Sequence, residues 1–210
     1  MGFYDRYIVP PLLGLACGTG PIRHQRRKIV PQAEGTVLEL GFGSGLNLPH
    51  YDRSRVDKLF ALEPAPGMLK RARKVAAKAD LPIEILPETA ETLSLPDASV
   101  DTVLVTYSLC TIPDPVTALA ASRRALRPGG KLLFCEHGKA PDAEVQRRQE
   151  KIEPWWTVIA GGCHLCRDIP RLVCDAGFEI QMLETMYLPK TPPWAGFNYW
   201  GSARAGSAKA

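Results

Sequence analysis

The strongest chemical signal in the sequence is a carboxylate followed by three alternating glycines. Glu39 lies near the end of the apolar run TVLEL, and Gly41, Gly43 and Gly45 follow that run directly. Glycines permit positive φ angles and a close backbone approach to a ligand, and a loop that leads into a helix offers free N–H groups. A dinucleotide fold needs a further glycine where Leu46 stands, which disfavours an NAD-dependent dehydrogenase. The acid favours a cationic ligand, such as one with an amino group and a sulfonium.

A second acid follows at the end of the next predicted strand. Glu63 comes directly after the run KLFAL. A carboxylate at this position accepts hydrogen bonds from both hydroxyls of a ribose. Ala90 and Glu91 come after the third predicted strand, in a loop that we expect to frame an adenine. The first half of the chain therefore predicts a nucleoside site.

Four side chains at the ends of two later strands are candidates for the reacting side of the site. Glu136 and His137 follow the fifth predicted strand, and an imidazole with a pKa near 6.5 suits a general base. His137 acts as a base or orients an acceptor, or it is a structural hydrogen-bonding group. Glu136 orients His137 or the acceptor, or it is likewise structural. Tyr107 ends the fourth predicted strand and Cys110 follows it, and an aromatic face there stabilises a cation.

Three further side chains are candidates for contact with a substrate. Trp155 and Trp156 line an apolar acceptor pocket, or one of them belongs to the core. His164 stands in a loop between two glycines and a predicted helix, where contact with a substrate and a structural role both stay open.

The cysteines predict packed thiols and no metal site. The six are Cys17, Cys110, Cys135, Cys163, Cys166 and Cys174. The start of the chain shows no secretory signal, so we expect reduced thiols in the cytoplasm and no disulfide framework. Cys163 and Cys166 form a lone C-x-x-C, but a zinc site needs further ligands, and His164 between the two thiols crowds the geometry.

Alternating strands and helices after residue 35 position these groups and predict a parallel α/β fold, with helices on both faces of a sheet. Strands are expected at Thr36–Leu40, Lys58–Leu62, Pro82–Leu86, Ser99–Tyr107, Lys131–Cys135, Phe178–Tyr187 and Asn198–Arg204. Helices are expected at Arg23–Pro31, Pro66–Ala79, Val116–Leu126, Asp142–Ile159 with a break at Pro154, and Ile169–Ala176, with a short helical piece from Leu46. The last two strands have no helix between them, so we expect an antiparallel finish.

Length and composition predict one globular domain. The 210 residues are 45% hydrophobic and 23% charged. We expect an N-terminal lid or helical segment at 1–34, the domain at 35–204 and a flexible tail at 205–210. The net charge of +4 comes from basic runs that we interpret as solvated helix faces, so no nucleic-acid partner is expected. The apolar stretch Ile8–Ala16 is too short to span a membrane, but it suits a peripheral membrane contact or a cover over the site.

Four sequence segments resemble the class I S-adenosylmethionine-dependent methyltransferases. They are VLELGFGSG, ALEPAPGML, AETLSLPDASVDTVLV and LRPGGKLLFCEHG, and the resemblance covers nearly the whole chain. It implies S-adenosylmethionine as the cofactor, a Rossmann-like seven-stranded sheet in the order 3-2-1-4-5-7-6, and an antiparallel seventh strand.

The resemblance also implies roles for particular residues. Glu39 and the three glycines would cradle the methionine part, and Glu63 would hold the ribose. The residues beside the adenosine would be Pro64, Met68, Thr89, Ala90 and Glu91, and those facing the methyl group would be Thr106 and Tyr107. The family often has Asp at the position of Thr89, so a hydrogen bond to the adenine amino group is not implied here.

The second half resembles the microsomal alkyl-thiol S-methyltransferases and their bacterial relatives. The matching pieces are YSLCT, FCEH, the Trp155–Trp156 pair and GGCHLCR. The resemblance implies direct in-line transfer of a methyl group to a small apolar acceptor, with a thiol as one acceptor. Phospholipid N-methyltransferases and quinone C-methyltransferases share the first half almost as well. A cofactor-binding protein without catalysis is an alternative from another class.

Overall fold

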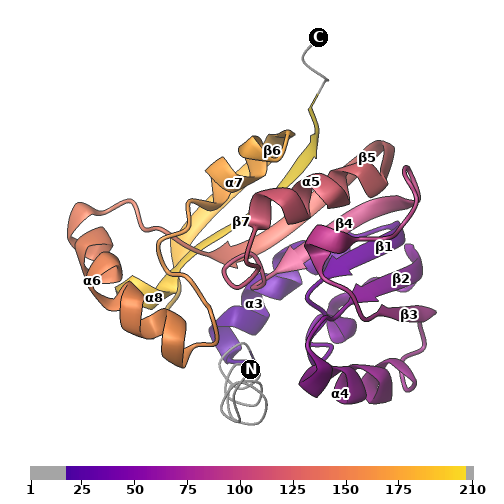
Figure 1. The fold of residues 1–210 in the computed structure, drawn as a ribbon, viewed down its shortest axis with the longest axis horizontal. Helices are drawn as coiled ribbons and strands as arrows, with labels where there is room; N and C mark the ends of the chain where they lie inside the picture. The colour runs from indigo at the N-terminus through magenta and orange to yellow at the C-terminus, as the bar shows by residue number, and fades with distance from the viewer. Residues whose placement is uncertain (1–17, 207–210) are drawn as a thin grey trace.

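The computed structural model describes residues 18–206 of the protein, and seven strands form one sheet at its centre (Figure 1). The strands are β1 (Gly35–Leu40), β2 (Val56–Leu62), β3 (Ile83–Leu86), β4 (Val100–Thr106), β5 (Leu126–His137), β6 (Phe178–Tyr187) and β7 (Phe197–Ala205). Their order is β3-β2-β1-β4-β5-β7-β6, and β7 runs antiparallel to both β5 and β6. The strand order and the antiparallel finish that the sequence indicated are confirmed.

The helices begin where the sequence offers proline or a capping side chain. They are α3 (Gly20–Ile29), α4 (Pro66–Ala76), α5 (Pro115–Ala125), α6 (Ala143–Ile159), α7 (Ile169–Asp175) and α8 (Pro193–Gly196), with short 3-10 turns η1 (Val30–Gln32), η2 (Leu48–His50) and η3 (Ala90–Thr92). The carboxylate of Asp114 accepts from the N–H of Thr117 at 3.0 Å, directly before Pro115 at the first position of α5. Proline is tolerated there because the first-turn N–H groups have no helical partner.

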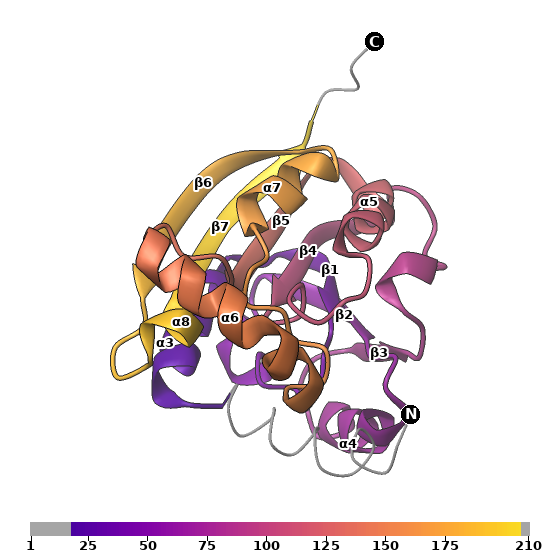
Figure 2. The same ribbon diagram turned by 60° about the vertical axis from the view of Figure 1, so that its left-hand side comes forward.

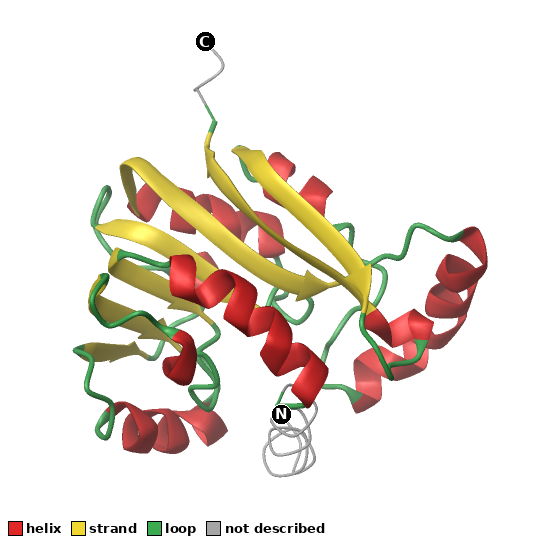
Figure 3. Cartoon of the chain, turned by 180° about the vertical axis from the view of Figure 1, so that it is seen from behind, coloured by secondary structure: helices red, strands yellow, loops and turns green. Residues whose placement is uncertain are grey.

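Helices cover both faces of the sheet (Figure 3). Because successive side chains of a strand point to opposite faces, Leu38 packs in a core with α5 and α7. Its neighbour Val37 packs in a second core with Ile29 of α3 and Ala72 of α4. Ile29 and the following Val30 are completely buried. The part of the expected lid that the structure describes, residues 18–34, thus includes a helix packed into this second core.

Helices α6 and α8 pack against each other (Figure 2), and they stand to one side of α4, α5 and α7 (Figure 1). The buried side chain of Gln149 ties this pair to the sheet. Its Oε1 accepts from the N–H of Ala140 at 2.9 Å. Its amide nitrogen lies 2.9 Å from the carbonyl oxygen of Gly138, 3.2 Å from that of Leu165 and 3.1 Å from that of Trp194. One side chain therefore joins the segments after β5, after α6 and at α8.

One local prediction is wrong. Helix α6 runs through Pro154 without a break, because the missing N–H costs one hydrogen bond in a helix that is 17 residues long and held by Gln149. The short helical piece expected from Leu46 is the 3-10 helix η2, which begins two residues later. Within residues 18–206, no helix is long and apolar enough to cross a membrane. The stretch Ile8–Ala16 lies outside the described residues.

Candidate functional site

In the glycine loop after β1, the backbone at Gly41 is packed against the protein, whereas the backbone at Gly43 is not. The N–H of Gly41 donates to the carbonyl oxygen of Leu62 at 3.1 Å. A Cβ on Gly41, whose φ is +75°, would lie 2.3 Å from Oγ of Ser108. Gly43 has a φ of +58°, and nothing in residues 18–206 lies within 4 Å of the place where its Cβ would stand. The backbone at Gly43 is therefore accessible to a ligand.

Glu63 lies beside this open backbone at the end of β2. Its Oε2 accepts from the N–H of Gly43 at 2.8 Å, and its Oε1 accepts from the N–H of Ala65 at 2.9 Å. Burial raises the pKa of Glu63, and the two backbone hydrogen bonds oppose this shift. Each carboxylate oxygen has a second lone pair, so Glu63 can accept two further hydrogen bonds. Pro64 is exposed and Met68 half-buried on the same side.

The expected adenine side is formed by η3 and the residue before it. Thr89 is exposed, Ala90 is buried and Glu91 is half-buried. Oε1 of Glu91 accepts from the N–H of Asp114 at 3.3 Å, which joins this turn to the start of α5. The hydroxyl of Thr89 pairs with that of Thr92 at 3.0 Å, a local contact within the turn.

Behind the glycine loop lies a buried polar network around Glu39, which is only 1% exposed. Its two oxygens accept from Nδ2 of Asn47 at 2.9 Å and from the hydroxyl of Tyr51 at 2.7 Å. Asn47 also accepts from Nη1 of Arg26 at 2.7 Å, and Arg26 donates to the hydroxyl of Thr106. Glu39 thus holds Asn47 and Tyr51 in place, which makes it a positioning residue in this structure.

Arg26 is the functional candidate that the sequence analysis missed. It belongs to the basic run Arg23–Lys28, but it is only 5% exposed, whereas its neighbour Arg27 is exposed. Its guanidinium lies 5.1 Å from the centre of the Tyr107 ring, and its Nε has no hydrogen-bond partner within the described part of the chain. A buried cation with a free donor beside the glycine loop can bind an anionic group.

Burial raises the pKa of Glu39 to about 7, although its hydrogen bonds with Tyr51 and Asn47 and the charge of Arg26 oppose the shift. The folded state therefore holds this proton more tightly than the unfolded state. The stabilisation is complete below pH 4.5 and is lost as the pH rises through about 7. The loss is on the order of 3 kcal/mol.

We therefore expect Glu39→Gln to flatten the pH dependence of the free energy of unfolding. Urea unfolding of both proteins at pH 5 and at pH 8 measures the difference. The wild type should lose about 2 to 3 kcal/mol more than the variant between these pH values. Equal losses would show that Glu39 titrates alike in the folded and unfolded states.

The ends of β4 and β5 meet at Tyr107 and Glu136. Tyr107 has a φ of +54°, an unfavourable conformation for a bulky residue, and its hydroxyl donates to Oδ1 of Asn198 at 2.6 Å. Oε1 of Glu136 accepts from the N–H groups of Ser108 and Leu109 at 2.7 and 3.1 Å. Burial raises the pKa of Glu136 to about 7, opposed by these bonds. Glu136 therefore fixes the loop after β4.

Beyond this loop, the structure brings together side chains that lie far apart in the sequence. Nε2 of His137 lies 3.1 Å from Sγ of Cys163, and the ligand atoms of Cys110, His137 and Cys163 all lie within 4.8 Å of one another. Trp156 packs against the two cysteines. Trp155 is 76% exposed, on the outer side of α6, and does not belong to this group.

His164 and Cys166 take other partners. Nδ1 of His164 lies 2.8 Å from Oε1 of Glu153, and Oε2 of Glu153 accepts from the N–H of Leu165 at 2.7 Å. Burial, followed by the charge of Glu153, raises the pKa of Cys166 to about 12. Cys110 and Cys163 are buried, as the prediction of packed thiols requires. The side chain beside Cys163 is, however, that of His137 and not that of Cys166.

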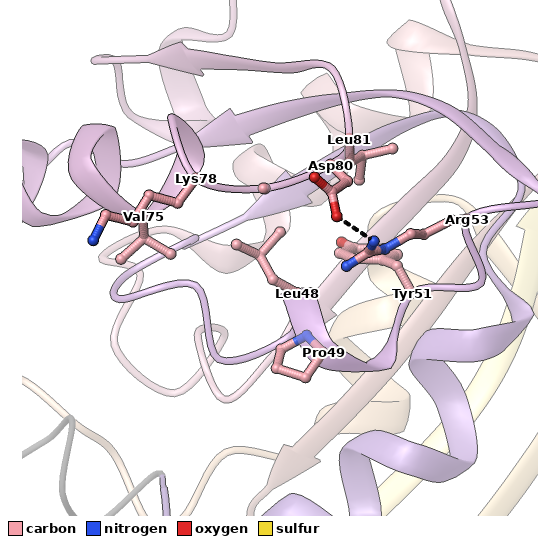
Figure 4. Close-up of a pocket in the computed structure, with 9 residues that line it drawn as sticks. Leu48, Pro49, Tyr51, Arg53, Val75, Lys78, Asp80 and Leu81 are labelled. Atoms are coloured by element: carbon pink, nitrogen blue, oxygen red, sulfur yellow. Dashed lines mark hydrogen bonds and ion pairs between the residues drawn. The ribbon is translucent and has the colours of Figure 1, made fainter.

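A surface cavity of about 340 Å³ lies elsewhere, between η2 and the end of α4 (Figure 4). An ion pair between Arg53 and Asp80, 2.7 Å long, crosses its rim, and both side chains are largely exposed. Tyr51 lines the cavity and donates to Glu39 behind it. None of the residues predicted for the nucleoside or the acceptor lines this cavity, so it is separate from the candidate site.

The fold and the site together define a class of protein. A glycine loop after β1, a buried acid at the end of β2 and an antiparallel β7 characterise the class I S-adenosylmethionine-dependent methyltransferases. Residues 38–134 match the family model described as a methyltransferase domain. With the relatives described next, this match shows that the chain belongs to the family of S-adenosylmethionine-dependent methyltransferases.

Curated relatives include thiol and phospholipid methyltransferases. The thiol S-methyltransferase TMT1B of Homo sapiens is 33% identical over 75% of this chain and 69% of its own length. The protein of the same name from Rattus norvegicus is 34% identical over 72% of this chain, which spans only 63% of the rat protein. A phosphatidylethanolamine N-methyltransferase of Cereibacter sphaeroides is 32% identical over 70% of this chain and 71% of its own length.

Solved structures show the same fold at low identity. A SAM-dependent methyltransferase from Thermotoga maritima superimposes with a TM-score of 0.67 at 22% identity, over 96% of this chain and 97% of that chain. The cyclase SpnF superimposes with a TM-score of 0.70 at 18% identity, over 97% of this chain and 94% of that chain. Since one of the two is named as a cyclase, the likeness supports the fold alone.

Proposed function

We propose that this chain transfers the methyl group of S-adenosylmethionine to the thiol of a small apolar molecule. The observation that carries the proposal is the sulfur-rich group of Cys110, His137 and Cys163, which packs against Trp156 at the carboxyl ends of β4 and β5. An apolar thiol is compatible with such surroundings. The similarity to thiol S-methyltransferases supports the same acceptor.

The residues of the donor side fit S-adenosylmethionine. The free lone pairs of Glu63 suit the two ribose hydroxyls, and the open backbone at Gly43 suits a close approach of the ligand. The buried Arg26, with its free Nε, suits the carboxylate of the methionine part. The cofactor supplies a methyl group already activated on a sulfonium, so the protein chiefly aligns donor and acceptor and excludes water.

The remaining residues of the site position the acceptor side. Tyr107 presents its ring beside Arg26 and is held by Asn198, so its aromatic face is fixed near the donor. Glu136 holds the backbone of the loop that leads to Cys110. A thiol is partly ionised near neutral pH and needs little help from a base. His137 therefore acts here by orienting the acceptor.

The proposal predicts release of S-adenosylhomocysteine when the purified protein receives S-adenosylmethionine and a small alkyl thiol. The matching alcohol of equal chain length is the control, because it lacks the ionisable sulfur. Turnover with the thiol and none with the alcohol supports the proposal. A protein that binds the donor but does not methylate the thiol contradicts it.

A phospholipid headgroup is the second candidate acceptor. The relative from Cereibacter sphaeroides favours it, as do the exposed Arg23 and Arg27 on α3 and the exposed Trp155 and Val158 on α6, since basic and apolar side chains suit a membrane surface. Vesicles that contain phosphatidylethanolamine, offered in the same assay, separate the two. Turnover only with these vesicles would replace the thiol by the lipid amine and indicate a peripheral membrane location.

A further inference from the structure

Cys110, His137 and Cys163 come from three separate segments and converge on one point. Cys110 lies in the loop after β4, His137 ends β5, and Cys163 lies in the loop after α6. Both thiols are buried, and the three ligand atoms lie within 4.8 Å of one another. Two sulfur atoms and one imidazole nitrogen form the ligand set of a site for zinc or another thiophilic metal.

Backbone contacts hold the three segments together independently of the three side chains. The N–H of His164 donates to the carbonyl oxygen of Cys110 at 2.8 Å, which joins two of the segments. The N–H of Lys139 donates to the carbonyl oxygen of Arg167 at 2.9 Å, which joins the third. The guanidinium of Arg167 in turn donates to the carbonyl oxygen of Ile112 at 2.7 Å. The ligand group is thus preorganised by the fold.

The geometry is close to what zinc requires. Tetrahedral Zn–S and Zn–N bonds place neighbouring ligand atoms about 3.6 to 3.8 Å apart. Nε2 of His137 and Sγ of Cys163 are 3.1 Å apart, so a shift of either ligand atom by about 0.5 Å makes room for the ion. Two thiolates and a neutral imidazole balance the charge of a divalent ion, which lowers the cost of burying it.

We propose that Cys110, His137 and Cys163 bind a zinc ion, and that its open fourth position takes the acceptor thiol. The second part rests on the proposed function. Three protein ligands with one open position are typical of catalytic zinc. The acceptor thiol loses its proton to solvent on binding the ion. Its sulfur then attacks the methyl carbon, the bond from that carbon to the sulfonium breaks, and the products are a thioether and S-adenosylhomocysteine.

Metal content tests the site without any reaction. The full chain is purified after growth with zinc, dialysed, and measured by elemental mass spectrometry. We expect about one zinc per chain in the wild type, and in Cys110→Ser and Cys163→Ser an affinity at least about 100-fold weaker in competition with a chelator. Zinc absent from the wild type, or unchanged affinity in both variants, overturns the site.

Two controls match these substitutions. Cys174→Ser changes an exposed thiol on α7, and Cys166→Ser changes the second thiol of the C-x-x-C, which lies outside the group. Both should keep the zinc. Binding of S-adenosylhomocysteine by every variant shows that the domain is folded. Loss of zinc in Cys166→Ser equal to that in Cys110→Ser would overturn the assignment of the ligands.

Cobalt substitution tests the fourth position separately from turnover. Cobalt(II) bound to thiolates absorbs in the visible and near-ultraviolet range, and a third thiolate should intensify the sulfur-to-cobalt band. We expect a small alkyl thiol to do this, and the matching alcohol to leave the spectrum unchanged. A metal-loaded protein that methylates the thiol without a spectral change would overturn the role of the ion. A spectral change without methylation would instead contradict the proposed function.

Discussion

Replacing Glu63 by alanine is expected to raise the Kd for S-adenosylmethionine about 100-fold. The carboxylate is buried at the end of β2, where its free lone pairs can accept from both ribose hydroxyls. Two hydrogen bonds to a charged group contribute about 3 kcal/mol together, which corresponds to this change in Kd. Isothermal titration calorimetry with S-adenosylhomocysteine gives the same comparison without turnover.

Two further variants separate ribose binding from loop support, because Glu63 also accepts from the N–H of Gly43. Glu63→Gln keeps one acceptor oxygen and should raise the Kd about 10-fold. Glu84→Ala removes an exposed acid on the neighbouring strand β3, where it pairs with Lys58 at 2.7 Å, and should leave the Kd unchanged. Wild-type binding by Glu63→Ala would exclude Glu63 from the ribose site.

The second large effect is expected at Gly43. Alanine there is strained by about 1 to 2 kcal/mol because φ is +58°, but its methyl group meets no atom of residues 18–206 within 4 Å. If the ligand approaches the backbone at Gly43, this methyl group occupies ligand space. We expect the Kd for S-adenosylmethionine to rise more than about 10-fold.

Gly129 offers a matched control, because it has a φ of +82° and likewise nothing within 4 Å of its added Cβ in the described structure. It lies near the start of β5, away from the glycine loop. Thermal unfolding should show similar losses of stability for Gly43→Ala and Gly129→Ala, whereas only Gly43→Ala should weaken binding. Equal binding by the two variants would place the ligand elsewhere.

The sequence predicts the sheet well because its central strands are apolar and rich in β-branched residues. β1 and β4 are buried on both faces, so no helical periodicity competes with the strand pattern. Prolines mark the starts of α4 and α5. The glycine loop was predictable because its chemistry is local: Glu39 and the glycines lie within seven consecutive residues, from 39 to 45.

The parts that could not be predicted depend on tertiary packing. Arg26 stands among exposed basic residues, and only the packing of α3 against β5 and β7 turns it inward. Asn47 gives no signal on its own, since its partners Glu39 and Thr106 lie on two different strands. The roles predicted for the site residues stay predictions until binding is measured.

The cysteine group shows the same limit. The C-x-x-C spacing relates Cys163 to Cys166, its neighbour in the sequence. The structure instead places Cys163 beside His137 and Cys110, from the ends of two strands. A sequence pattern reports only the spacing of residues along the chain. Parallel strands bring residues that are distant in the sequence to one edge of a sheet.

The single side chain of Gln149 has a consequence for how such a protein can diverge. It bonds to the segments at Gly138 and Ala140, at Leu165 and at Trp194, which lie on the side proposed for the acceptor. Replacing Gln149 would release all of these segments together, whereas an outward side chain such as Trp155 can change without disturbing any of them. We therefore expect new acceptor preferences to arise by substitution of residues that these segments carry, whereas Gln149 and its hydrogen bonds stay unchanged.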